Sequence, residues 1–282
     1  MPHVVKEAAL HQGRLSLLSP DGRDMSGGLV PVSVAMWSRV FIGSDNVQTL
    51  ESVRTVMWSG DRSDCLMPAL SHRVAERHLS EADPDMAALI RRVGRCRLTQ
   101  DRERREPYDA LVRAVVYQQL HGRAAAAILG RLEAAAGGLP SAEWLLEQDE
   151  GCLRGCGLSA RKAETLQGLA RARLDGTVPS RAQAARLDDE KLIARLISLK
   201  GVGRWTVEML LMFTLGRPDV MPVDDFGVRE GWRRIKGLDA QPKPRALLEE
   251  SLPLAPWRSV ATWYLWRASE EGRAVAANVL TG

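Results

Sequence analysis

Two adjacent acids, Asp224 and Asp225, are the clearest candidates for chemistry in this 282-residue sequence. They follow Pro222-Val223 and precede a segment with apolar residues at helical spacing: Val228, Trp232 and Ile235. A carboxylate at the beginning of a helix can simply cap its free backbone N–H groups. Capping needs one acid, so the other is free for a second task. A fixed, desolvated carboxylate can stabilise developing positive charge or orient an attacking water.

A glycine-flanked turn is the second candidate site. It lies in Leu199–Trp205, between two segments of helical pattern, and its centre is Gly201-Val202-Gly203. Two glycines around one apolar residue allow a tight turn with unusual backbone angles. They also let backbone N–H groups approach a phosphate at the beginning of the next helix, while Val202 packs inward. The same pattern fits a plain helix–helix turn, and the two glycines alone do not decide between the two interpretations.

Helices must position both sites, because residues 67–282 alternate apolar and charged residues rich in Ala, Leu and Arg. Helix start signals are Asp83-Pro84, Pro107, Ser141, Ser159 and Leu187-Asp188-Asp189. Within this region the pattern predicts helices over Ala124–Ala136 and Ala142–Gln148. Two helical segments also flank the turn, the second through Val207, Leu210, Leu211 and Phe213. We therefore predict an all-α domain over residues 67–282.

The first 66 residues have a different composition, with scattered Ser, Pro and Gly and no sustained helical period. The stretch Leu29–Ile42 suits one or two short strands. We predict that residues 1–66 form an N-terminal extension, weakly ordered or with short strands. A start of the native protein at Met67 is the alternative.

Composition narrows the class of protein without identifying it. Hydrophobic residues make up 45% and charged residues 26%, which is typical of a soluble globular protein. The net charge of +4 permits nucleic-acid binding but does not establish it. With no run of about 18 apolar residues and no secretory signal, we predict a cytoplasmic chain without membrane contact.

The cysteines give no sign of a metal centre. The chain has four, Cys65, Cys96, Cys152 and Cys156, and the last two have no His or Cys neighbours to complete a zinc site. No four-cysteine run follows the acidic pair, so we predict no iron–sulfur cluster. Reduced cysteines packed as small apolar residues are the expectation.

The order of helix, L-x-G-V-G, helix, P-V-D-D and helix resembles the helix-hairpin-helix DNA glycosylases. The match is closer to their bacterial 3-methyladenine DNA glycosylase II branch and covers roughly residues 70–270. Three more segments resemble that branch: Ala110–Leu120 (ALVRAVVYQQL), Cys156–Ala163 (CGLSARKA) and Pro256–Ser259 (PWRS). The resemblance implies a bundle of two helical subdomains with the active site in the cleft between them.

By this resemblance Asp225 is the catalytic carboxylate. The superfamily's catalytic Asp precedes an apolar helix residue by three positions, as Asp225 precedes Val228, whereas Asp224 precedes Gly227. We expect Asp224 to cap or support. Members that also cleave the strand carry Lys two residues after the second hairpin glycine, where this chain has Trp205. The implied reaction is hydrolysis of the N-glycosidic bond of alkylated bases, which leaves an abasic site.

The resemblance also implies a pocket for an extruded base. Aromatic faces suit a cationic base, and each aromatic residue also has an alternative interpretation as core. The predicted pocket residues are Trp205, Phe226, Trp266, Tyr117 and Met209.

DNA contacts are implied at the hairpin and at two helix ends: Gln118, Gln119, Ser159, Lys162, Lys200, Gly201, Val202, Gly203, Arg204 and Thr206. Of the two glutamines, we expect Gln119 to fill the gap left by the extruded nucleotide. His121 stands where the family usually has Ser, so this turn departs from the family's pattern. The superfamily's hairpin carbonyls hold a monovalent cation, Na⁺ or K⁺, and here they belong to Ile197, Leu199 and Val202.

The implied function is therefore a monomeric repair enzyme that acts on double-stranded DNA and requires no cofactor. Two other functions are open at this point. One is a DNA-binding protein that keeps the fold without catalysis. The other is a glycosylase for oxidised or mismatched bases, against which the missing lysine and cluster cysteines weigh.

Overall fold

The computed structural model describes residues 10–11, 14–15, 72–98 and 105–281, with side chains up to Glu271. The chain divides into two units, Met1–Val32 and Ser33–Gly282. In the first unit, β1 (Leu10–His11) pairs antiparallel with β2 (Arg14–Leu15). Short strands thus occur in the predicted extension, whereas Leu29–Ile42 and the predicted boundary at Met67 lie outside the described residues.

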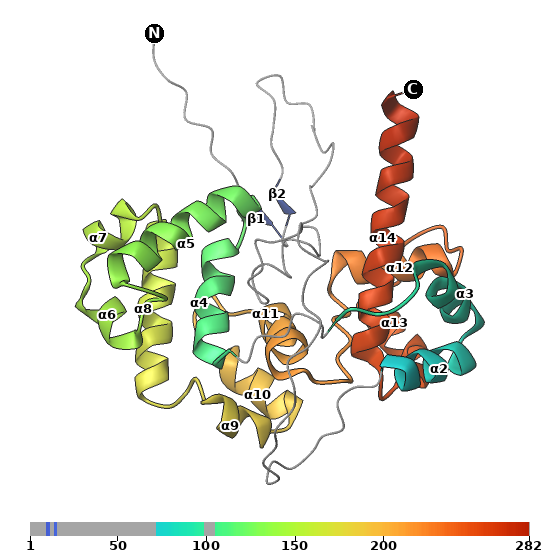
Figure 1. Cartoon of the computed structure of the whole chain (residues 1–282), viewed down its shortest axis with the longest axis horizontal. Helices are drawn as coiled ribbons and strands as arrows, with labels where there is room; N and C mark the ends of the chain where they lie inside the picture. The colour runs from blue at the N-terminus through green and yellow to red at the C-terminus, as the bar shows by residue number, and fades with distance from the viewer. Residues whose placement is uncertain (1–9, 12–13, 16–71, 99–104, 282) are drawn as a thin grey trace, which may run out of the picture. The chain divides into compact units, whose positions relative to one another are not determined.

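Within the second unit, the described elements are helical and pack in two groups, which confirms the predicted all-α fold (Figure 1). The first group comprises α4 (Pro107–Tyr117), α5 (Gly122–Ala136), α6 (Ala142–Glu147), α7 (Glu150–Gly155), α8 (Ala160–Leu174), α9 (Arg181–Ala185), α10 (Asp189–Leu196), α11 (Arg204–Met209) and the π-helical η1 (Leu210–Leu215). The second group comprises α2 (His72–Ala82), α3 (Pro84–Val93), α12 (Phe226–Ile235), α13 (Pro244–Glu250), the 3₁₀ turn η2 (Leu252–Leu254) and α14 (Arg258–Thr281).

The predicted start signals act as helix caps. The side chains of Asp83, Ser141, Ser159 and Asp188 each accept a hydrogen bond from the first turn of α3, α6, α8 and α10. Two predicted boundaries shift slightly: α5 begins at Gly122, and α6 ends at Glu147. Three short helices, α7, α9 and α13, went unpredicted because five to seven residues show too little periodicity.

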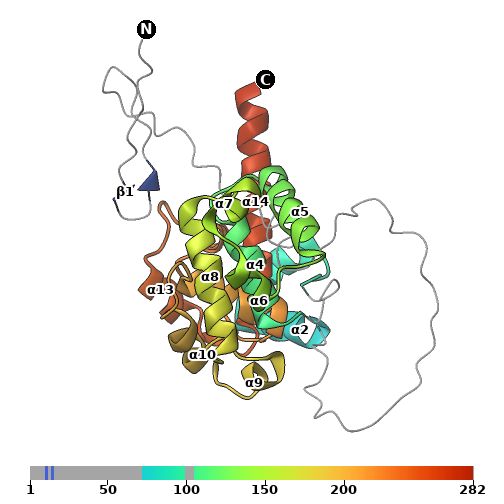
Figure 2. The same ribbon diagram turned by 90° about the vertical axis from the view of Figure 1, so that its left-hand side faces the viewer.

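Helix α4 is the centre of the first group. It packs against α5, α8 and η1, and Figure 2 shows α8 running beside it. Because neighbours surround it, apolar side chains on several of its faces are fully buried, among them Leu111, Val112 and Val115. This packing fixes the C-terminal end of α4, where Gln118 and Gln119 follow.

Helices α12 and α14 pack closely in the second group. A Cβ built at Gly231 of α12 would overlap the backbone carbonyl of Leu265 on α14. Only glycine therefore permits this approach. The contact places Trp266, the next residue of α14, near the N-terminal end of α12.

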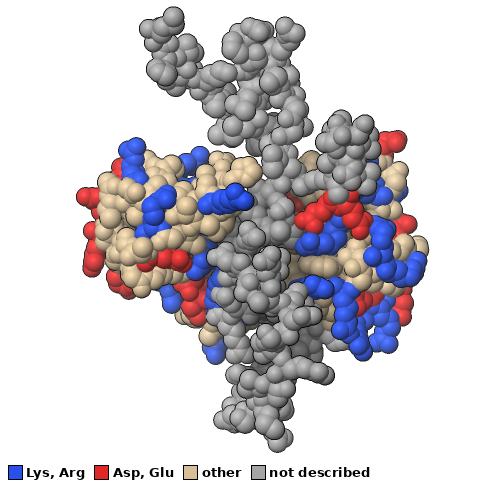
Figure 3. Space-filling model, turned by 45° about the horizontal axis from the view of Figure 1, so that its top comes forward, with Lys and Arg blue, Asp and Glu red and all other residues tan. Residues whose placement is uncertain are grey.

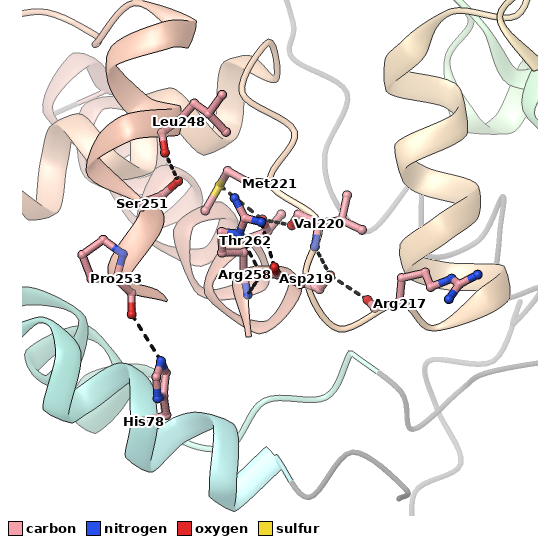
Figure 4. Close-up of polar contacts among 11 residues, drawn as sticks. His78, Arg217, Asp219, Val220, Met221, Leu248, Ser251, Pro253, Arg258 and Thr262 are labelled. Atoms are coloured by element: carbon pink, nitrogen blue, oxygen red, sulfur yellow. Dashed lines mark hydrogen bonds and ion pairs between the residues drawn. The ribbon is translucent and has the colours of Figure 1, made fainter. Parts of the chain in front are cut away.

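The loop between η1 and α12 is tied to the beginning of α14 (Figure 4). Arg258 pairs with Asp219 at 2.7 Å. The hydroxyl of Ser259 donates to the carbonyl of Arg217 at 2.7 Å and accepts from the N–H of Val220 at 2.9 Å. The P-W-R-S segment therefore holds the loop that delivers the acidic pair.

Candidate active site

The carboxylate of Asp225 is held by three N–H groups. Its Oδ1 accepts from the backbone N–H of Val228 at 2.8 Å and from Nε1 of Trp266 at 3.0 Å. Its Oδ2 accepts from Nε1 of Trp205 at 2.8 Å. The donors come from α12, α14 and α11, so both helical groups meet at this side chain. Three donors fix the orientation of the partly buried carboxylate.

Asp225 is therefore the N-cap of α12 as well as the acceptor of both indoles. The expectation that Asp224 caps this helix is wrong, because Asp224 is exposed and the cap bond comes from its neighbour. Oδ1 both caps α12 and accepts from Trp266, and Oδ2 accepts from Trp205.

The ring of Trp266 is fixed from two sides. It stacks on Phe213 of η1, with ring centroids 6.0 Å apart and an interplanar angle of 8°. On the other side, a Cβ at Gly227 would lie 2.9 Å from Cδ1 of Trp266 and 3.2 Å from Oδ1 of Asp225. Glycine at position 227 thus leaves room for the indole to reach the carboxylate.

The remaining predicted pocket residues differ in exposure. Phe226 directly follows Asp225, and its 51% exposure leaves its ring open to a ligand. Tyr117 and Met209 are buried in the core. The structure thus brings Trp205, Trp266 and Asp225 together and places Phe226 beside them.

The hairpin between α10 and α11 has the backbone that its glycines predict. Gly201 has φ +84°, and a Cβ there would lie 2.7 Å from the side chain of Thr165 on α8. Val202 is buried at the centre of the turn. Gly203 is the N-cap of α11 and brings no side chain to the helix end, which suits the approach of an external anion.

The charged residues near the hairpin are paired within the protein. Lys200 contacts Glu164 at 2.6 Å. Arg204 binds both carboxylate oxygens of Glu190 and also reaches Glu208 at 3.1 Å. On the face shown in Figure 3, Lys and Arg side chains likewise alternate with Asp and Glu. Thr206 is buried, and Ser159 uses its hydroxyl to cap α8.

Glu208 of α11 is a buried acid that went unpredicted. It is 4% exposed, and burial raises its pKa to about 7 even though Arg204 opposes the shift. Asp224, the exposed neighbour of Asp225, also raises the Glu208 pKa through like charge. Its position three residues after Trp205 was visible in the sequence, but its burial depends on the tertiary packing of α11.

Of the predicted DNA contacts at the end of α4, Gln119 is exposed, whereas Gln118 and Lys162 donate hydrogen bonds to backbone carbonyls within the protein. Gln119 is exposed and has φ +55°, a conformation that costs a non-glycine residue about 1–2 kcal/mol. Gln118 donates from Nε2 to the carbonyl of Gly201 at 3.1 Å. Lys162 donates from Nζ to the carbonyl of Val116 at 2.7 Å, and burial lowers its pKa to about 8.

The predicted ligands of a monovalent cation are backbone carbonyls of the hairpin. Backbone carbonyls are hard ligands of the type that Na⁺ and K⁺ prefer, and Ile197 and Val202 flank the turn that contains Leu199. The carbonyl of Leu199 already accepts from the N–H of Val202 at 3.1 Å. Among the side chains described over residues 72–98 and 105–271, there is no cluster of His, Cys, Asp and Glu suited to a metal ion.

Among the helices that the structure describes, none combines the length and the apolar character needed to span a bilayer.

Residues 112–256 match a family described as the HhH-GPD superfamily base excision DNA repair protein. The chain is 44% identical over 198 residues to DNA-3-methyladenine glycosylase 1 of Schizosaccharomyces pombe, which covers 70% of this chain and 87% of the relative.

Solved structures give the same result. The Schizosaccharomyces pombe 3-methyladenine DNA glycosylase in complex with abasic DNA is 44% identical and has a TM-score of 0.63, covering 70% of this chain and 97% of its own. A DNA-3-methyladenine glycosidase from Bacillus halodurans is 31% identical with a TM-score of 0.64, covering 69% of this chain and 88% of its own.

Proposed function

This chain belongs to the HhH-GPD superfamily of base excision DNA repair proteins, in its DNA-3-methyladenine glycosylase branch, and we propose that Asp225 is its catalytic carboxylate. Its activity is hydrolysis of the N-glycosidic bond of alkylated bases in DNA. The proposal extends to a monofunctional reaction, which removes the base without cleaving the strand and leaves an abasic site.

One observation carries the assignment: the carboxylate of Asp225 is fixed by two indole N–H groups from different helical groups. Breaking an N-glycosidic bond develops positive charge on the sugar. A carboxylate held in place stabilises that charge without reorganising during the reaction. It can also orient or deprotonate the attacking water.

Alkylated purines suit a site with one carboxylate and aromatic neighbours. A 3- or 7-methyl adduct already carries positive charge and leaves without a strong general acid. Such a cationic base favours electron-rich rings, and Phe226, Trp205 and Trp266 lie around Asp225. The proposed substrates, alkylated purines, are therefore selected by the positive charge of the base rather than by the shape of one particular base.

The identity of Trp205 supports base removal without strand cleavage. A lyase needs an amine at this position to form a Schiff base. Here the position carries an indole whose N–H is bonded to Asp225. At the position where a lyase carries its attacking amine, this chain therefore has a side chain that orients the carboxylate.

Double-stranded DNA is the proposed partner, gripped by the backbone of Gly201 and Gly203 with Gln119 inserted in place of the extruded nucleotide. A monovalent cation bound by the carbonyls of Ile197, Leu199 and Val202 would bridge the hairpin to a phosphate. The three donors to Asp225 belong to the same chain as Asp225, so we propose that the protein works as a monomer. We also propose that it acts on chromosomal DNA in the cytoplasm.

The test is a panel of duplexes, each with one lesion: 7-methylguanine, ethenoadenine, 8-oxoguanine or a mismatched uracil. Released bases are identified by chromatography, and borohydride traps any Schiff base. We expect 7-methylguanine release to exceed 8-oxoguanine release by at least about tenfold, with no trapped covalent product. Preferred release of 8-oxoguanine, or substantial trapping, contradicts the proposal. Tight DNA binding without release of any base indicates a non-catalytic DNA-binding protein.

A further inference from the structure

The turn between α4 and α5 is held in place by two side chains that were expected to contact DNA. Lys162 of α8 donates to the carbonyl of Val116 in the last turn of α4. Gln118, the C-cap of the same helix, donates to the carbonyl of Gly201 in the hairpin. Both donors therefore already have acceptors within the protein.

These two bonds flank the strained residue of the turn. Among the described residues, Gln119 is the one non-glycine with positive φ. A left-handed conformation at such a residue persists only where its surroundings enforce it. The turn is closed by the N–H of Leu120, which donates to the carbonyl of Tyr117 at 3.3 Å. The hydrogen bond from the preceding residue, Gln118, anchors the strained position to a second element.

The anchor itself is rigid. Gly201 has φ +84° and lies against Thr165, so its carbonyl has one defined direction. Thr165 belongs to α8, which also carries Lys162 three residues earlier. The ammonium group of Lys162 is turned onto the carbonyl of Val116 at 2.7 Å, and burial lowers its pKa to about 8. Helix α8 therefore supports both the end of α4 and the hairpin.

We propose that Gln118 and Lys162 are positioning residues for base extrusion, which hold Gln119 in its left-handed conformation on the same rigid frame as the hairpin. The distance between the hairpin, which binds phosphate, and Gln119, which enters the duplex, is then fixed. This inference rests on the proposed function, because insertion matters only if a base leaves the duplex. It reassigns Gln118 and Lys162 from contacting DNA to aligning the residue that does.

The test compares substrates that differ only in the work of extrusion. The variants are Gln118→Met and Lys162→Met, each of which removes the donor at similar length. The matched control is Lys191→Met, at an exposed lysine of α10. Single-turnover release of 7-methylguanine is measured in a paired duplex and in a duplex with an abasic site opposite the lesion, where extrusion is easy.

We expect both variants to slow release from the paired duplex by about fivefold or more, and from the unpaired substrate by less than about twofold. Lys191→Met should match wild type on both. A 2-aminopurine next to the lesion should show reduced unstacking in the two variants. Equal losses on both substrates, or no loss on the paired duplex, would overturn the proposal. If Lys162→Met does not fold, Gln118→Met and Gln118→Glu decide the question in the same assays.

Failure of this inference and failure of the proposed function give different results. If wild type releases no alkylated base from either substrate, the proposed function fails. The 2-aminopurine signal does not depend on base release, so it still reports whether the variants impair unstacking.

Discussion

Nε1 of Trp205 lies 2.8 Å from Oδ2 of Asp225, and this hydrogen bond joins α11 of one helical group to the N-cap of α12 in the other. Trp205 directly follows Arg204, the first residue after the hairpin. The hairpin proposed to bind DNA therefore ends two positions before the residue whose side chain orients the carboxylate. A displacement of the hairpin would change the direction of Asp225.

Replacing Trp205 by Phe keeps an aromatic ring and removes the N–H that bonds to Asp225. We expect base release from 7-methylguanine DNA to slow by about tenfold, since a hydrogen bond to a charged group contributes about 1.5–3 kcal/mol. DNA affinity should stay within about twofold. Trp144→Phe, on α6 and away from the site, is the control for loss of an indole. Unchanged release by Trp205→Phe would show that the indole only packs.

Gly227→Ala tests the space that Trp266 occupies. The added Cβ would lie 2.9 Å from Cδ1 of Trp266, so either the indole or the first turn of α12 must move. We expect base release to fall by at least about tenfold, with a change in tryptophan fluorescence. The control is Gly130→Ala in α5, where an added Cβ meets nothing within 4 Å. Wild-type rates for Gly227→Ala would mean that the position of Trp266 is not critical.

Gly231→Ala tests the packing of α12 on α14. Its Cβ would overlap the carbonyl of Leu265, which is backbone and cannot rotate away. We expect the free energy of unfolding to fall by about 2–4 kcal/mol, measured by urea denaturation. In Gly168→Ala of α8, where the added Cβ has open space, the same measurement should show no loss. A stable Gly231→Ala protein would contradict the close approach of these helices.

Glu208 makes stability depend on pH. Its pKa is raised from 4.5 to about 7, so between these values the folded protein holds a proton that the unfolded chain has lost. Stability therefore falls as the pH rises through this range, by about 3 kcal/mol in all. Glu208→Gln should remove this fall and leave a flatter profile of unfolding free energy between pH 4.5 and 8. A profile parallel to that of wild type would show that Glu208 does not titrate in this range.

Local signals explain most of what the sequence predicted. Asp83, Ser141 and Ser159 cap helices through bonds to residues two or three positions away, so composition and spacing suffice to find them. The same holds for the register of Asp225 to Val228, which the structure shows as a hydrogen bond of 2.8 Å. Trp205 and Trp266 were expected near Asp225 through a family resemblance and lie there.

The features that the sequence did not indicate depend on distant neighbours. The partners of Arg204 and Lys200 include acids on α10 and α8, and Gln118 meets a carbonyl 83 positions further along the chain. No local pattern indicates that these side chains have internal partners. The raised pKa of Glu208 likewise follows from burial, which only the packed fold determines.

The exchange Asp225→Asn tests the central claim most directly, with Asp224→Asn as the matched control at the exposed neighbouring acid. Asn keeps the size of the side chain and the cap on α12, but it removes the charge and presents an amide NH₂ to one of the two indoles. We predict that Asp225→Asn binds abasic and 7-methylguanine duplexes within about threefold of wild type while single-turnover base release falls by at least about a hundredfold. Asp224→Asn should retain most of the rate. Near-wild-type release by Asp225→Asn, or an equal loss in Asp224→Asn, would contradict the assignment of Asp225 as the catalytic carboxylate.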